Sequence, residues 1–200
     1  MGKSRRPVRL PASGNTALAA SALIQTVLGI EFALSGLDKF ADPRFRQHFE
    51  SFVQSSPGSQ QGVFAGLIHT FVLPYVSVWA FVIKWTELLL GLILIIGAVE
   101  IARRRFSGRF GAAYGYEVPV ALVSAMAGLT AAGLSLSIFL LEGGPLPTIQ
   151  AGRAFTSAIP VELLIVPLGV AITWLEFGRF RVLRVALPSK NLHPHPNPPP

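Results

Sequence analysis

The chain of 200 residues is too apolar for an ordinary soluble domain, because 51% of its residues are hydrophobic and only 14% are charged. Its formal charge of +7 does not indicate a nucleic-acid-binding protein, since the basic residues stand in short clusters between long apolar stretches. The absence of cysteine from the sequence excludes disulfides, thiol catalysis, iron–sulfur clusters and cysteine-ligated zinc. Together these properties predict an integral membrane protein.

Four stretches are long and apolar enough to cross a bilayer as helices, which requires about 20 mostly apolar residues. They are expected at residues 16–37, 75–99, 118–141 and 158–177. We therefore predict an all-α integral membrane four-helix bundle over residues 16–185. A basic segment at 1–15 precedes it, and a flexible proline-rich tail at 186–200 follows it.

Basic residues flank the expected spans unevenly. Three clusters fall on one side of the membrane: Lys3, Arg5, Arg6 and Arg9; Arg103, Arg104, Arg105 and Arg109; Arg179, Arg181, Arg184 and Lys190. The positive-inside rule then places both termini in the cytoplasm. We expect the protein to reside in a bacterial inner membrane.

A long connection, from Asp38 to Pro74, joins the first two expected spans on the outer side. Apolar residues recur within it at helical spacing, at Val63, Phe64, Leu67, Ile68, Phe71 and Val72. This pattern predicts an amphipathic helix that lies in the membrane interface.

Small residues recur at four-residue spacing in the first and third expected spans. They are Gly29 with Ala33, Ser124 with Gly128 and Ala132, and Gly133 with Ser137. Because lipid provides no hydrophobic drive between helices, small residues let two backbones approach closely. We expect them to pack helices of this chain together, with a dimer or partner face as the alternative.

Ionisable side chains inside the expected spans give the strongest functional signal, because each is costly in hydrocarbon unless it is paired or hydrated. We identify four. Lys84 and Glu87 lie three residues apart on one face of the second span, where they can pair. Glu31 and Glu162 lie in the outer halves of the first and fourth spans. Their depths allow all four to converge on one polar pocket that opens to the outer side.

Each candidate also has a structural interpretation. Lys84 and Glu87 can form an ion pair that only fixes packing, and Glu162, just after Pro160, can stabilise the start of its helix. His69, in the outer connection, can bind a quinone head group or simply belong to an amphipathic helix. No histidine lies inside an expected span, which excludes a transmembrane bis-histidine haem. Neither a bound flavin nor a metal site is identifiable from the sequence.

Two stretches of the sequence resemble a known family. The first expected span ends in GIEFALSGLDKF, residues 29–40, and the second contains WTELLLGLILIIG, residues 85–97. These resemble the G-x-x-F-x-x-x-G-x-x-K-like and E-x-x-x-G-x-x-L-x-x-G-like helices of the DoxX/DoxD family of small four-helix membrane proteins. The resemblance covers residues 24–100.

The resemblance implies oxidoreduction at the membrane, because DoxD-type proteins are small subunits of thiosulfate:quinone oxidoreductases. It also implies that Lys39 and Glu87 are the polar positions of the family pattern, in which Glu31 and Lys84 have no counterpart. Quinone is then expected as a substrate. A partner redox subunit or a larger membrane complex would supply the electrons.

We therefore expect a membrane subunit of a quinone-linked oxidoreductase that acts on a small inorganic sulfur donor such as thiosulfate. Glu87 and Glu31 would pass protons, and Lys84 would stabilise charge on the quinone head group. The quinone or substrate would be bound by Lys39, His69 and Glu162. The alternative is a non-catalytic accessory or scaffold subunit of a larger respiratory or photosynthetic complex. A small transporter is a third hypothesis, for which the inverted repeats typical of transporters are missing from the sequence.

Overall fold

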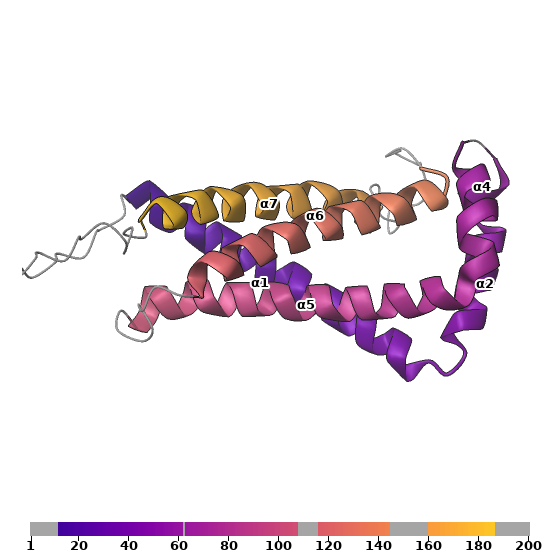
Figure 1. Cartoon of the computed structure of the whole chain (residues 1–200), viewed down its shortest axis with the longest axis horizontal. Coiled ribbons are helices and arrows are strands. Elements are labelled where there is room, and N and C mark those ends of the chain that lie inside the picture. The colour runs from indigo at the N-terminus through magenta and orange to yellow at the C-terminus, as the bar shows by residue number, and fades with distance from the viewer. Residues whose placement is uncertain (1–11, 62, 108–115, 145–159, 187–200) are drawn as a thin grey trace, which may run out of the picture.

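A computed structural model describes residues 12–61, 63–107, 116–144 and 160–186, and within these ranges the chain forms helices and no strand. Four long helices dominate the described part (Figure 1): α1 (Ala12–Ala41), α5 (Val76–Ser107), α6 (Glu117–Leu141) and α7 (Val161–Ala186). The predicted tail beyond residue 186 and residues 1–11 of the basic segment lie outside the described residues.

Each long helix contains a stretch that is long and apolar enough to cross a membrane. These stretches are Thr16–Ala41, Phe64–Arg103, Glu117–Leu141 and Val161–Val185. Each overlaps one of the four predicted spans, which confirms the all-α four-helix membrane bundle. The second stretch, at 40 residues, is longer than the roughly 20 that a bilayer requires, because it includes part of a helical segment that bends away from α5.

That bent segment belongs to a group of short helices between α1 and α5. They are α2 (Phe45–Ser55), α3 (Pro57–Gln60), α4 (Val63–Leu67), a π-helix η1 (Ile68–Val72) and a 3₁₀ turn η2 (Leu73–Tyr75). In Figure 1 they lie across one end of the bundle, which we call the loop end. The opposite end, where α1 and α6 begin and α5 and α7 end, is the terminal end.

The helix predicted from the apolar spacing of residues 63–72 is confirmed as α4 and η1. It continues into α5 through η2, where Pro74 occupies the first turn. Because proline lacks a backbone N–H, it interrupts the helical hydrogen bonding at this point, and the chain turns into the spanning direction. The sequence pattern does not predict α2, which is mostly polar and buries only Val53.

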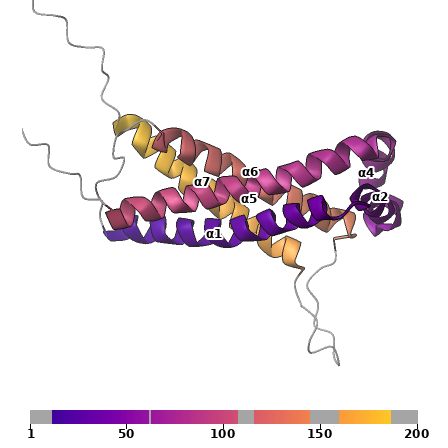
Figure 2. The ribbon, with the colours of Figure 1, turned by 90° about the horizontal axis from the view of Figure 1, so that it is seen from below.

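The four long helices form two pairs, α1 with α5 and α6 with α7, and Figure 2 shows the second pair running obliquely to the first. Close approach within each pair depends on glycine. A Cβ atom at Gly36 would lie 2.6 Å from the backbone nitrogen of Leu88, and one at Gly91 would overlap the backbone of Ala33. Space for α5 against α1 therefore exists only because these positions lack side chains.

Close approach of α6 and α7 also depends on glycine. A Cβ atom at Gly128 would lie 2.7 Å from the carbonyl oxygen of Gly169, and one at Gly169 would lie 2.6 Å from that of Gly128. This confirms that the small residues around Gly29 and Gly128 pack helices of this chain together. Gly133 is different, because a Cβ atom at this position would have no neighbour within 4 Å among the described residues.

The hydrophobic core lies midway along the bundle, where the two pairs meet. It contains Leu28 and Phe32 of α1, Leu90 and Leu94 of α5, Ala127 and Ala131 of α6, and Ile172 of α7. Buried polar side chains lie on either side of this core, one group toward each end. The core therefore separates two polar clusters that share no residue.

Candidate functional site

The first cluster, which we call the loop-end cluster, consists of Ser35, Lys39 and Glu87. The Glu87 side chain is only 4% exposed, and Lys39 Nζ lies 2.5 Å from its Oε2 atom. The Ser35 hydroxyl donates a hydrogen bond of 2.9 Å to the same oxygen and accepts one of 2.8 Å from Lys39. A cation and a hydroxyl from α1 therefore neutralise and solvate a carboxylate that α5 buries.

Local helix geometry explains why these side chains meet. Ser35 and Lys39 are four residues apart and share one face of α1. Gly36 lies beside Leu88 of α5, so the short Ser35 side chain can reach the neighbouring helix. The Lys39 side chain is 23% exposed, so contacts lead from the buried carboxylate to the edge of the bundle.

Lys84 does not pair with Glu87. Its Nζ atom lies 4.8 Å from the ring centroid of Phe40, and it pairs with no carboxylate among the described residues. The ring of Phe40 also packs edge-to-face against Trp85, with centroids 4.9 Å apart. The predicted pairing of Lys84 with Glu87 is therefore wrong. The register of α1 against α5 brings Lys39 to Glu87 and Phe40 to Lys84, where a cation–π contact forms instead.

The predicted pocket that joins four ionisable side chains does not form around Glu87, whose described partners are those of the loop-end cluster. Glu31 is exposed on the surface of α1. Glu162 lies in the first turn of α7, which is the position predicted for a carboxylate that stabilises a helix start. His69 Nε2 lies 3.2 Å from the carbonyl oxygen of Ser59, so its ring links η1 to α3.

Two carboxylates outside the spans have shifted pKa values. The backbone N–H of Arg44 and the side chain of His48 hydrogen-bond to Asp42 and lower its pKa below 3.8. Burial, followed by the nearby charge of Glu162, raises the pKa of Glu142 above 4.5. Both groups lie at the loop end, so this end of the molecule carries two carboxylates whose pKa values are shifted in opposite directions.

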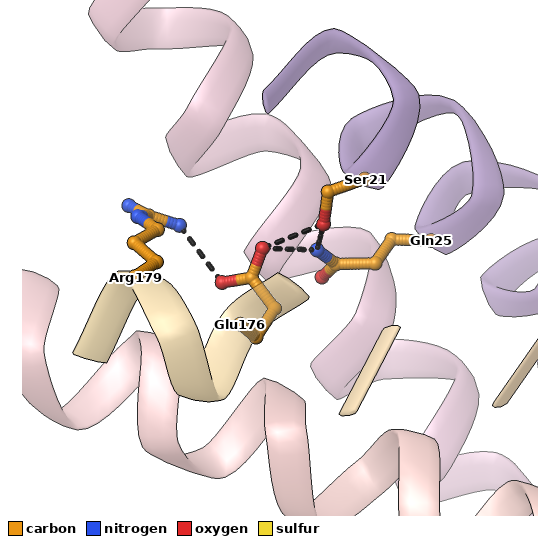
Figure 3. Close-up of polar contacts among 4 residues, drawn as sticks. All are labelled: Ser21, Gln25, Glu176 and Arg179. Carbon is orange, nitrogen blue, oxygen red and sulfur yellow. Dashed lines mark hydrogen bonds and ion pairs between the residues drawn. The ribbon is translucent and has the colours of Figure 1, made fainter. Parts of the chain in front are cut away.

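The second cluster, which we call the terminal-end cluster, consists of Ser21, Gln25, Glu176 and Arg179 (Figure 3). Glu176 is 0% exposed. Its Oε1 atom accepts hydrogen bonds from the Ser21 hydroxyl at 2.6 Å and from Gln25 Nε2 at 3.1 Å. Arg179 lies one helical turn beyond Glu176 on α7 and donates to Oε2 at 3.1 Å. The cluster therefore connects α1 to α7.

Sequence reasoning missed the terminal-end cluster, although Glu176 lies inside the predicted span 158–177. The available signal is a carboxylate in an apolar stretch with an arginine three residues later, and the same spacing recurs at Glu100 and Arg103. Glu100 is 6% exposed and lies 2.9 Å from Arg103. Two arginines that sequence reasoning interprets only as flanking charges thus neutralise buried carboxylates.

Two apolar grooves lie between α5 and α6. The larger, of about 370 Å³, is nearer the loop end and includes Trp79, Thr86 and Gly133 in its walls. The smaller, of about 210 Å³, is nearer the terminal end and has Ser124 as its polar wall residue. Within the described ranges, no group of three or more histidine or carboxylate side chains is placed to hold a metal ion.

Comparison of the chain with family models, with curated proteins and with solved structures gives no match. The resemblance to the DoxX/DoxD family over residues 24–100 therefore stays a prediction from the sequence. Any functional conclusion depends on the chemistry of the two clusters and of the grooves.

Proposed function

We propose that this chain is a membrane subunit of a quinone-linked oxidoreductase and that its loop-end cluster handles the protons of quinone chemistry. The observation that carries the proposal is the buried Glu87 carboxylate, which is neutralised across the helix interface by Lys39. A buried ion pair that can exchange a proton without unfolding is a suitable acid–base group in hydrocarbon. The resemblance of residues 24–100 to the DoxX/DoxD family supports the same assignment.

We also infer a direction of travel for the protons. A quinone takes up two electrons and two protons when it becomes a quinol, and the protons come from water. The part-exposed Lys39 side chain lies between Glu87 and the edge of the bundle, so it connects the carboxylate to the aqueous side. The electrons would come from a partner redox subunit, with a small sulfur compound such as thiosulfate as the donor that the family resemblance suggests.

Glu31 has a place in this scheme. It is four residues before Ser35 and eight before Lys39 on α1, so the three positions follow one stripe of the helix surface. Glu31 is exposed on this stripe, one turn closer to the bundle centre than Ser35. A quinone arriving through the lipid would meet Glu31 first. We propose that Glu31 and Glu87 pass protons and that Lys39 is the cation paired with Glu87.

We propose more limited roles for the remaining predicted site residues. Lys84, with Phe40 and Trp85 beside it, offers a cation and two aromatic rings on the surface for a quinone head group. For His69 and Glu162 we propose only that they help to hold the site in place from the loop end. Arg103, Arg179, Arg181 and Arg184 lie at the terminal end and favour a cytoplasmic location for it, which would place the loop-end cluster on the outer side of an inner membrane.

Purification from native membranes in mild detergent, followed by mass spectrometry, identifies the partner and any bound quinone. The purified complex is then assayed for reduction of a decyl-chain quinone with the wild type and with Glu87→Gln and Glu31→Gln. Loss of a general acid–base group lowers the rate by about 10²–10⁴-fold. Glu50→Gln, at a partly exposed position of the loop-end helix α2, is the matched control and should leave the rate unchanged.

Unchanged quinone reduction in both Glu87→Gln and Glu31→Gln would contradict the proton-passing role. The accessory-subunit alternative would then be favoured, for which the structure also offers an argument. Glu87 and Glu176 both find their cations inside this chain, as purely structural ion pairs do. That alternative predicts a large energy-converting complex in the purification, with assembly unaffected when Lys39 and Glu87 are replaced together by apolar residues.

A further inference from the structure

The arginines at the terminal end differ in whether a carboxylate neutralises them. Arg103 and Arg179 each form an ion pair with a glutamate one turn earlier on the same helix, at 2.9 and 3.1 Å. Arg181 and Arg184 are exposed, and neither forms a hydrogen bond or an ion pair within the described part of the chain. Two positive charges at the end of α7 are therefore available to a partner outside the chain.

These two arginines can act on the same group. Arg181 and Arg184 are three residues apart on α7, so they are neighbours on the helix surface. Each guanidinium presents several N–H donors in a planar fork that matches the oxygens of a phosphate. The preceding carboxylate on α7, Glu176, is already bound within the terminal-end cluster. The pair is therefore suited to an external anion with several oxygens.

The length of α7 places the two arginines at the depth of lipid headgroups. The helix begins at Val161, and about 20 residues are needed to cross the hydrocarbon core. A span that begins at Val161 thus ends near Phe180, and Arg181 and Arg184 follow it directly. Arginines just beyond a span attract the anionic headgroups of the adjoining leaflet, so charge and depth both favour a phospholipid phosphate.

An apolar stripe leads from the arginines into the membrane along the same face of α7. Trp174 is seven residues before Arg181, which places the two side chains on one face, about 10 Å apart along the helix axis. Trp174 is 81% exposed, and Val170 and Phe177 on this face are 52% and 48% exposed. An exposed apolar surface below a pair of cations matches the acyl chain and the headgroup of one lipid molecule.

We propose that Arg181 and Arg184 bind the phosphate of an anionic phospholipid whose acyl chain lies along Val170, Trp174 and Phe177. The guanidinium groups donate hydrogen bonds to the phosphate oxygens. A zwitterionic lipid also has a phosphate but carries its own cation, which competes with the arginines, so the site favours an anionic lipid. It lies at the opposite end of the bundle from the loop-end cluster and does not depend on the proposed redox function.

Tryptophan fluorescence gives a direct test of this site. Of the three tryptophans in the sequence, Trp79 and Trp85 belong to α5 and only Trp174 belongs to α7. Bromine atoms on a lipid acyl chain quench tryptophan fluorescence on contact. The full chain is reconstituted in phosphatidylcholine vesicles that contain a small fraction of brominated phosphatidylglycerol or, separately, of brominated phosphatidylcholine. The difference between the wild type and Trp174→Phe gives the signal of Trp174.

The relative binding constant at Trp174 should be about tenfold higher for the brominated phosphatidylglycerol than for the brominated phosphatidylcholine. The reason is that each arginine beside an anionic headgroup strengthens binding several-fold. Equal quenching of Trp174 by the two lipids overturns the proposal.

The decisive variant combines Arg181→Gln with Arg184→Gln. Both positions are exposed and without an ion pair among the described residues, so the fold should remain intact. We expect the preference for phosphatidylglycerol at Trp174 to disappear, while quenching by the brominated phosphatidylcholine stays unchanged. Arg44→Gln with Arg46→Gln is the matched control, because it removes the same charge from exposed arginines at the loop end. A preference that persists in the first variant, or that the control abolishes equally, contradicts the site.

Discussion

The two buried clusters hold a carboxylate in different ways. At the loop end, the cation that neutralises Glu87 comes from another helix, since Lys39 belongs to α1 and Glu87 to α5. At the terminal end, the cation comes from the same helix, since Arg179 follows Glu176 by one turn of α7. There the neighbouring helix contributes only neutral donors, Ser21 and Gln25.

The two arrangements therefore suit two different roles of a buried carboxylate. The cation at the loop end is 23% exposed and the arginine at the terminal end only 8%. The loop-end cluster is therefore open to its surroundings at Lys39, while the terminal-end cluster is closed and joins α1 to the other helix pair. Glycine contacts already hold α1 against α5, so the loop-end ion pair is less necessary for packing than for neutralising Glu87.

The largest expected effect comes from removing the cross-helix cation. Lys39→Met leaves the Glu87 carboxylate buried without a charge partner, which should destabilise the fold by about 3 kcal/mol. Unfolding in mixed micelles of mild detergent and dodecyl sulfate measures the change in free energy. Lys39→Arg keeps the charge and is the control, and adding Glu87→Leu to Lys39→Met should restore most of the loss. A Lys39→Met protein of wild-type stability would contradict the role of Lys39 in neutralising Glu87.

The corresponding change at the terminal end should cost less. In Arg179→Met, the Glu176 carboxylate keeps the hydrogen bonds from Ser21 and Gln25, so we expect a loss of about 2 kcal/mol. The same unfolding assay compares it directly with Lys39→Met. If Arg179→Met were the more damaging of the two, neutral donors would contribute little, and the distinction between the clusters would fail.

A double-mutant cycle tests whether neutral donors connect the two helix pairs. Ser21→Ala, Glu176→Gln and the double variant should give a coupling energy of about 1 kcal/mol, because the two side chains share a short hydrogen bond between α1 and α7. Thr26→Ala combined with Glu176→Gln is the control, since the Thr26 hydroxyl donates to its own helix. Equal coupling in both cycles would show that the effect is not specific to the bond.

The sequence predicts the four spans and a charged Glu87 inside one of them, because apolar length and a charge within it are properties of a single stretch of chain. It does not predict which lysine pairs with Glu87. Lys84 lies within helical reach on the same helix, while Lys39 lies on another. The choice depends on the register of α1 against α5, which the close contacts at Gly36 and Gly91 determine. Such contacts are visible only in three dimensions.

The terminal-end cluster can be predicted in part from the sequence. Glu176 stands in an apolar stretch three residues before Arg179, which is the spacing of an ion pair within a helix. The hydrogen bonds from Ser21 and Gln25 are not predictable in this way, because they join residues more than 150 positions apart. The lack of a hydrogen-bond partner for the buried Ser124 hydroxyl among the described residues is equally unpredictable, because in the sequence Ser124 resembles any small residue of a packing motif.

The smallest expected effect concerns Glu142, a carboxylate at the loop end that lies outside the spans. Burial and the charge of Glu162 raise the pKa of Glu142 above 4.5. The folded state therefore binds this proton more tightly than the unfolded state, so the stabilisation is present below about pH 4.5 and is lost as pH rises through the folded-state pKa. Glu142→Gln should stabilise the protein at neutral pH by less than about 1 kcal/mol, since solvent screens this partly exposed group.

Asp42, at the same end of the molecule, has a pKa shift of the opposite sign. Its pKa is lowered by hydrogen bonds from the Arg44 backbone and the His48 side chain, so its contribution is present above pH 3.8 and is lost as pH falls through the folded-state pKa. Unfolding measured from acidic to neutral pH should therefore show Glu142→Gln gaining stability, relative to the wild type, as pH rises and Asp42→Asn losing it. Parallel profiles for the two variants would contradict the assigned causes. Opposite slopes would show that the stability of the loop end depends on pH through these two partly exposed carboxylates.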